Sequence, residues 1–174
     1  MSPIAHSGIG LLGWELASSR KNIKTFLLFV FVANMADIDF LLYLVFRMRR
    51  SYIHQYYTHN IFFVVIAASL LSLLLRTRRE RLGLILTGLF HLVQDIIVFD
   101  PVRPVGIRLF YPLSSKLINL GFFPHLSRGG LRAMASIKNM EVLLLEVLIF
   151  VAPVLIIFWK RLRLDFGRRD FWTI

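Results

Sequence analysis

Long apolar runs restrict this chain more than any other feature of its sequence. Five of them, separated by short clusters of lysine and arginine, are Ile4–Ala17, Thr25–Phe46, Asn60–Leu75, Leu82–Phe99 and Glu141–Trp159. Hydrophobic residues make up 57% of the 174 residues, against about 45–50% in soluble domains. A soluble core of this size has no room for so much apolar surface, so the runs predict helices in a lipid bilayer.

The predicted fold is an all-α, polytopic helical membrane protein with about five apolar helices, in one domain over residues 1–174. A hydrocarbon core of about 30 Å needs about 20 helical residues, so the shorter first and third runs are expected to tilt or insert partially. Between the last two runs, Asp100–Met140 predicts a re-entrant or interfacial segment. The expected parts are a metal-site core at 3–114, a C-terminal transmembrane helix at 141–159 and a basic, aromatic tail at 160–174.

The net charge of +11 comes from lysine and arginine that flank the apolar runs. Basic residues in this position are typical of membrane-flanking loops, so we expect membrane lipids as partners and no nucleic acid. With five crossings, about 12 basic residues fall on one side and about 9 on the other. This weak bias favours a multi-pass inner-membrane protein with a cytoplasmic carboxyl terminus. The sequence leaves the oligomeric state open.

Histidine and aspartate side chains lie inside or beside the apolar runs. A charge at the bilayer centre costs about 2.5–3.5 kcal/mol on insertion scales, so such residues indicate a functional site unless they pair inside the bundle. The candidate metal ligands are His6, Asp37, Asp39, His54, His59, His91 and Asp95. Alternating crossings place all seven on one side at a similar depth, near the extracytoplasmic face.

The spacing of these residues also suits a metal. His91 and Asp95 are four residues apart and share one helical face. Asp37 and Asp39 diverge on a regular helix and converge only where a helix ends or kinks. The chain has no cysteine, so a metal would be held by imidazole and carboxylate, which suits Zn²⁺, Mn²⁺ or Fe. Seven donors exceed the needs of one tetrahedral ion, which makes two ions an open alternative.

Glycines in the first apolar run have a structural interpretation. Gly8, Gly10 and Gly13 lie within Ile4–Ala17. Small residues at this spacing let a second helix approach closely in a membrane. We therefore expect this run to pack against other helices.

Five motifs occur in order: S-P-I-A-H-S-G-I-G (Ser2–Gly10), A-D-I-D (Ala36–Asp39), H-Q-Y-Y-T-H (His54–His59), H-L-V-Q-D (His91–Asp95) and G-I-R-L-F-Y-P-L-S (Gly106–Ser114). They resemble those of the YdjM-type inner-membrane metal-dependent hydrolases, a family whose named member is LexA-regulated. The resemblance covers Pro3–Ser114 and implies that the seven candidate ligands bind metal. A more distant similarity, to zinc-dependent phospholipase C, is an analogy.

The chain departs from the family pattern around its ligands. Ala36 replaces the usual proline, Gln55 and Tyr56 replace an Arg-Gly pair, and Asn60 replaces a serine. The missing arginine is a residue type that binds phosphate, so these changes leave the substrate class open.

The expected activity is hydrolysis of a lipid phosphate ester by a metal-activated water. Asp37 or Asp39 would orient or deprotonate that water. The substrate-binding candidates are Arg108, Lys116 and Thr58, with Arg103 and Arg128 as further basic residues near the mouth. The alternative for each basic residue is that it extends to lipid headgroups.

Other classes of function remain as alternatives. One is a non-catalytic scaffold or interaction protein that keeps metal for stability. A metal transporter is disfavoured because the donors are confined to one half of the membrane. An intramembrane metalloprotease is disfavoured because no histidine is followed by glutamate, as H-E-x-x-H requires.

Overall fold

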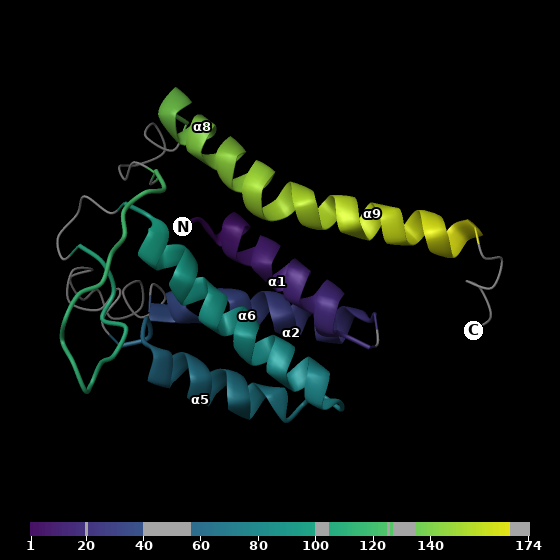
Figure 1. Cartoon of the computed structure of the whole chain (residues 1–174), viewed down its shortest axis with the longest axis horizontal. Helices are drawn as coiled ribbons and strands as arrows, with labels where there is room; N and C mark the ends of the chain where they lie inside the picture. The colour runs from purple at the N-terminus through teal and green to yellow at the C-terminus, as the bar shows by residue number, and fades with distance from the viewer. Residues whose placement is uncertain (20, 40–56, 100–104, 125, 127–134, 168–174) are drawn as a thin grey trace.

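Helices form every regular element in the part of the chain that the structure describes, which confirms the all-α class there (Figure 1). The computed structural model describes residues 1–19, 21–39, 57–99, 105–124, 126 and 135–167. Its elements are α1 (Pro3–Ala17), α2 (Ile23–Asn34), a 3₁₀-helix η1 (Met35–Ile38), α5 (Ile61–Ser72), α6 (Arg78–Ile97), α8 (Ile137–Glu146), a π-helix η2 (Val147–Val151) and α9 (Ala152–Gly167).

Polar residues determine where the helices begin. A side-chain oxygen accepts a hydrogen bond from the backbone N–H three residues on at four helix starts, those capped by Ser2, Asn22, Asn60 and Ser136. At the start of α6, Thr77 and Glu80 form a reciprocal capping box. Each cap satisfies a backbone donor that the helix itself leaves unpaired, which is worth about 1 kcal/mol.

Helix α1 packs against α2, α6, η2 and α9 (Figure 1). Helix α6 also packs against α2 and α5. The glycines of α1 permit the close approach that the sequence predicts. A Cβ added to Gly10 would lie 2.8 Å from Val30 Cα, and one added to Gly8 would lie 2.7 Å from the Phe150 carbonyl oxygen. Side chains larger than hydrogen would therefore push α2 and η2 away from α1.

Among the described residues, one helix is long and apolar enough to cross a bilayer, the 24 residues Ile137–Lys160. The prediction of about five spanning helices is not confirmed. The run Thr25–Phe46 does not form one helix, because α2 ends at Asn34 and η1 follows; residues 40–46 lie outside the described part. Helices α2 and α5 have 12 residues each, which span about 18 Å of a core about 30 Å thick.

In the predicted re-entrant or interfacial segment Asp100–Met140, residues 105–124 contain no helix, and α8 begins at Ile137. Backbone hydrogen bonds tie residues 105–124 to the end of the bundle where α6 ends and α5 begins. Phe123 N–H donates to the Ile97 carbonyl at 2.9 Å, and Ile61 N–H donates to the Leu109 carbonyl at 2.9 Å. This segment therefore lies at the same end of the bundle as the carboxyl end of α6.

Candidate metal centre

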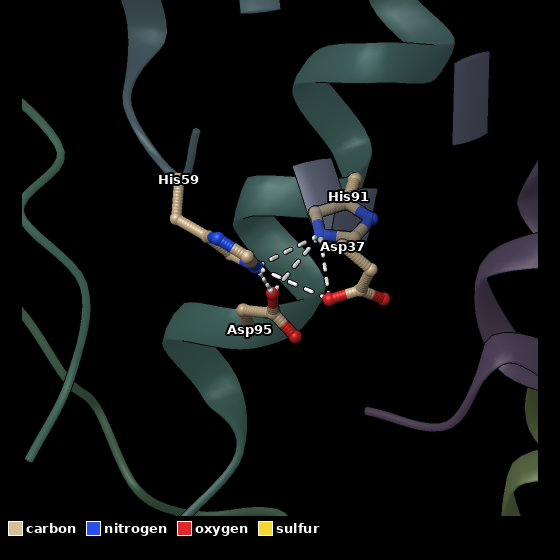
Figure 2. A group of neighbouring side chains, drawn as sticks. All are labelled: Asp37, His59, His91 and Asp95. Atoms are coloured by element: carbon tan, nitrogen blue, oxygen red, sulfur yellow. Dashed lines mark hydrogen bonds and ion pairs between the residues drawn. The ribbon is translucent and has the colours of Figure 1, made fainter. Parts of the chain in front are cut away.

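Three parts of the chain bring four side chains that could hold a metal ion to one point at this end of the bundle (Figure 2). Asp37 comes from η1, His59 precedes α5, and His91 and Asp95 come from the last two turns of α6. Four donor atoms, one from each residue, lie within 4.8 Å of one another. His91 and Asp95 share a helical face, as their spacing predicts.

The donor atoms have the spacing that a tetrahedral ion requires. His91 Nε2 lies 3.1 Å from Asp95 Oδ2, and His59 Nε2 lies 3.3 Å from both Asp95 Oδ2 and Asp37 Oδ1. The two Nε2 atoms are 3.5 Å apart, and His91 Nε2 lies 4.0 Å from Asp37 Oδ1. Bonds to zinc of about 2.0–2.1 Å give ligand-to-ligand distances of about 3.3 Å in a tetrahedron. The four side chains therefore fit a divalent ion.

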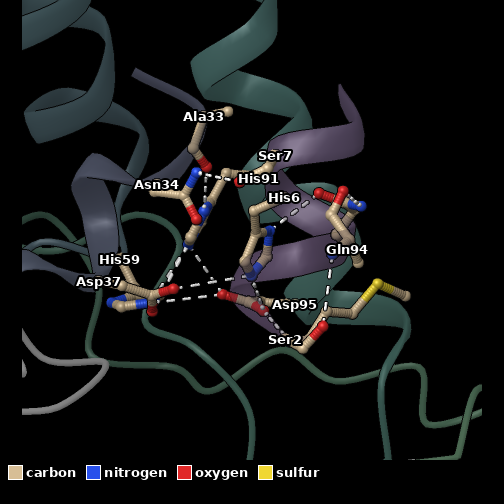
Figure 3. Close-up of polar contacts among 12 residues, drawn as sticks. Ser2, His6, Ser7, Ala33, Asn34, Asp37, His59, His91, Gln94 and Asp95 are labelled. Atoms are coloured by element: carbon tan, nitrogen blue, oxygen red, sulfur yellow. Dashed lines mark hydrogen bonds and ion pairs between the residues drawn. The ribbon is translucent and has the colours of Figure 1, made fainter. Parts of the chain in front are cut away.

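Protein acceptors fix the orientation of both imidazoles. His91 Nδ1 lies 2.7 Å from the Ala33 carbonyl oxygen (Figure 3), and His59 Nδ1 lies 3.3 Å from Asp39 Oδ2. Because a carbonyl or carboxylate oxygen only accepts, each neutral ring carries its proton on Nδ1. The lone pair of each Nε2 then points toward the centre. Metal-binding histidines commonly have this arrangement, in which a hydrogen bond from Nδ1 fixes the tautomer and orients the ring.

Asp37 and Asp39 were both predicted as metal ligands and as candidate bases, but they lie at different positions relative to the centre. Asp37 faces the centre, whereas Asp39 is fully buried behind His59 and is not part of the group of four. Thr58, predicted to bind substrate, is also buried, and its hydroxyl donates to Asp39 Oδ2 at 3.0 Å. The structure thus places Asp39 and Thr58 where they support His59.

His6 is a further donor beside the four (Figure 3). Its Nδ1 lies 2.9 Å from Gln94 Oε1, and Gln94 Nε2 donates to the Ala5 carbonyl at 3.1 Å. Since the Gln94 amide nitrogen bonds to Ala5, its oxygen faces His6 and accepts from Nδ1. His6 Nε2 is buried and has no hydrogen-bond partner in the described part of the chain; it lies 3.5 Å from Asp95 Oδ1 and 3.7 Å from Asp37 Oδ2.

The start of α1 is held in place by two acidic side chains from other helices. Glu146 is buried, and its carboxylate accepts from both the backbone N–H and the hydroxyl of Ser2. The α-ammonium of Met1 donates to Asp95 Oδ1 at 2.7 Å. Sequence reasoning missed Glu146 and Gln94. The available signals were an acidic residue inside the run that ends at Trp159 and a polar neighbour of Asp95.

Negative charge dominates the centre. The carboxylates of Asp37, Asp39 and Asp95 each place an oxygen 3.3 Å from a ring nitrogen of His59. The Asp37 side chain is 28% exposed, whereas the Asp95 side chain is 8% exposed and the three imidazoles are at most 1% exposed. The centre thus attracts cations and is reached from the side of Asp37.

Two other predicted residues, Arg108 and Lys116, lie on the described segment that follows α6. Arg108 is half-buried and directly precedes Leu109, whose carbonyl accepts from the first residue of α5. Lys116 is exposed on the same segment. The positions outside the described residues are His54, Arg103, Arg128 and the end of the tail, 168–174.

Comparison with known proteins gives a family and no further relative. No curated protein and no solved structure matches the chain. A family model described as "YdjM inner membrane protein" matches residues 1–164, a stretch that includes the whole centre and the helix that is long enough to span a membrane. The chain therefore belongs to the YdjM inner membrane protein family.

Proposed function

We propose that this protein is a membrane-embedded, metal-dependent hydrolase that cleaves a phosphate ester of a lipid or lipid-like substrate. The observation that carries the proposal is the cluster of Asp37, His59, His91 and Asp95 with tetrahedral donor spacing. Imidazole lone pairs and carboxylate oxygens repel one another at 3.1–3.3 Å unless a cation or a proton lies between them. A bound divalent ion would relieve this repulsion at every donor at once.

Zinc is the ion we expect. Imidazole and carboxylate without thiolate are its usual donors in catalytic sites, and Mn²⁺ or Fe takes the same set. When bound, such an ion supplies Lewis acidity toward a phosphoryl oxygen and lowers the pKa of water.

Asp37 is the residue that we assign to orient the attacking water. Its side chain is the most exposed among the donors, so solvent and substrate reach it first. Asp39 acts through His59 and is a positioning residue, because its carboxylate is fully buried against the His59 ring and the Thr58 hydroxyl. The sequence left two candidates, Asp37 and Asp39, for the residue that orients or deprotonates the water; this proposal assigns the role to Asp37.

An amphiphilic substrate is supported by the segment at this end of the bundle. Leu113 and Phe122 are 81% and 71% exposed there, and Arg108 and Lys116 lie on the same segment. Exposed apolar side chains suit acyl or prenyl chains, and basic side chains suit a phosphate group. The combination favours a lipid phosphate ester over a soluble one.

We propose a multi-pass arrangement with the metal centre near the extracytoplasmic side. In support, the basic cluster that opens α6 lies at the opposite end of that helix from His91 and Asp95. The chain contains no cysteine, so single cysteines can report sidedness without background. Leu113→Cys in intact cells should react with an impermeant maleimide, and Arg76→Cys should react only after the membrane is opened. The reverse pattern would invert the orientation.

The test of the hydrolase combines metal content with turnover. Protein purified in detergent should contain zinc or manganese by elemental analysis and should release phosphate from a panel of phospholipid and polyprenyl-phosphate substrates in mixed micelles. Asp37→Asn should lower the rate at least about 100-fold, because it neutralises a carboxylate assigned both to hold the ion and to orient the water. The matched control is Glu141→Gln, an exposed carboxylate elsewhere in the chain, which should retain full activity.

Two results would decide against the proposal. Metal-free protein with a normal fold and full activity would remove the metal from the reaction. Protein that contains metal, unfolds when the metal is chelated and hydrolyses no member of the panel would identify a metal-stabilised scaffold.

A further inference from the structure

Asp37 and Asp95 each present their two oxygens to different histidines. Asp37 Oδ1 and Asp95 Oδ2 face the Nε2 atoms of His59 and His91, as described above. Asp37 Oδ2 and Asp95 Oδ1 instead face His6 Nε2, at 3.7 Å and 3.5 Å. Both carboxylates therefore lie between two groups of imidazole nitrogens, the position from which a carboxylate bridges two ions.

The rings of His6 and His91 are stacked, with centroids 3.9 Å apart and planes inclined by 21°. An imidazole binds a metal along its own plane, through the Nε2 lone pair. Lone pairs that lie in two separate, nearly parallel planes do not meet at one ion. Ions held in these two planes would be separated by roughly the spacing of the rings, and two-metal hydrolytic sites have ions about 3.5–4 Å apart.

His6 Nε2 is also a buried polar atom that lacks a hydrogen-bond partner among the described residues. Because Gln94 holds the proton on Nδ1, Nε2 of the neutral ring presents a lone pair to two carboxylates. A buried acceptor that faces carboxylate oxygens and no donor destabilises the fold unless a cation or a proton binds there. The α-ammonium of Met1 donates to Asp95 Oδ1 at 2.7 Å, so this oxygen has a positively charged partner that an ion bound there would replace.

We infer that His6 Nε2, Asp37 Oδ2 and Asp95 Oδ1 form a second divalent-cation site that shares both carboxylates with the first. The inference rests on the proposed metal centre and assigns each donor atom to one of two ions. Three protein donors leave an open position, as catalytic sites do and closed structural sites do not. The His6 site is therefore the one with room for a phosphoryl oxygen of the substrate.

The test uses Mn²⁺, which is both countable and paramagnetic. Wild-type protein in detergent is loaded with Mn²⁺, freed of unbound ion and measured by elemental analysis and electron paramagnetic resonance. We expect two Mn²⁺ per chain and the broadened spectrum of an exchange-coupled pair. His6→Ala should hold one Mn²⁺ per chain and give the six-line spectrum of an isolated ion.

Ser7→Ala is the matched control. Ser7 is the next residue of α1 and accepts a hydrogen bond from Asn34 Nδ2 at 3.1 Å, outside the donor set. This variant should keep two coupled ions. Circular dichroism of each variant identifies any loss of fold, and His6→Gln, which retains most of the side-chain volume, replaces His6→Ala if that variant unfolds.

The outcomes separate this inference from the proposed function. One uncoupled Mn²⁺ per chain in wild-type protein, whatever the variants do, would overturn the second site and leave the first. Two ions in both wild-type and His6→Ala protein would overturn the role of His6. The absence of any bound ion would overturn the proposed metal centre itself.

Discussion

Glu146 of the C-terminal helix accepts two hydrogen bonds from Ser2, the residue that caps the first helix. The carboxylate and both Ser2 donors are buried. Glu146→Ala removes the acceptor and leaves two buried donors unpaired, which should lower the free energy of unfolding by about 1–3 kcal/mol. Thermal unfolding in detergent, followed by circular dichroism, measures the loss. Glu141→Ala, which removes an exposed carboxylate of α8, should leave Tm nearly unchanged; an equal loss in both variants would contradict the prediction.

The two aspartates near the end of α2 should differ in their effect on metal affinity. Asp37→Ala removes a donor, so it should abolish binding at the first site. Asp39→Ala removes only the acceptor for the His59 ring, which should weaken binding about 10–100-fold. Competition with a coloured chelator measures both affinities. Asp39→Asn keeps an acceptor oxygen and should restore much of the affinity; failure to do so, with a loss as complete as in Asp37→Ala, would make Asp39 a ligand.

Gly10 of α1 should tolerate no larger residue. The Cβ of Gly10→Ala would meet the backbone of Val30 on α2, and overpacking of this kind costs about 1–3 kcal/mol. Denaturation of the purified protein in detergent with increasing sodium dodecyl sulfate measures the change. Leu16→Ala, on an exposed part of the same helix, is the control and should change stability by less than about 0.5 kcal/mol. Equal stability of Gly10→Ala and the wild type would contradict the close packing.

The free energy of unfolding should decrease at low pH as Glu80, in the capping box of α6, becomes protonated. Burial opposes ionisation of Glu80, but hydrogen bonds from Ser19 and Thr77 outweigh it and lower the pKa of this interfacial carboxyl from 4.5 to about 2. A carboxyl whose pKa is lower in the folded state stabilises the fold above pH 4.5, and this contribution is lost as pH falls to about 2. Glu80→Gln should therefore lose less stability than the wild type across this range. Unfolding curves at pH 5, 4, 3 and 2 (about one unit apart, to follow the titration) give the comparison.

Metal should stabilise the folded protein. An ion that binds only the folded state, at a free concentration 100 times its Kd, adds about 2.7 kcal/mol. Zinc should therefore raise Tm and a chelator should lower it. His91→Ala should show neither effect, because it removes a donor. An identical response in His91→Ala would place the stabilising ion elsewhere.

The helical class could be predicted from the apolar runs, but the helix lengths could not. The run Thr25–Phe46 is apolar on both sides of the point where α2 gives way to η1, so composition gives no sign of the break. The two aspartates at the break were the available signal, because they converge only where a helix ends or kinks. That condition is met by η1, and it orients only Asp37 toward the centre.

The candidate ligands could be predicted because their spacing is a local sequence pattern. The residues that hold them in place could not, because those contacts join distant parts of the chain. His91 and Asp95 form a local pattern, four residues apart on one helix. Gln94 supports a residue 88 positions away, and Glu146 one 144 positions away. Such contacts depend on how helices pack, and no periodicity of a single helix encodes them.

The hydrogen bond from Ser2 to Glu146 also sets an order for assembly. The five described donors around the centre lie within the first 95 residues, whereas Glu146 lies on α8, which follows them in the chain. A chain synthesised from its amino terminus therefore contains these five residues before the residue that secures α1 is made. Clustering of the five side chains and docking of α8 against the start of α1 are thus separable steps for a nascent chain.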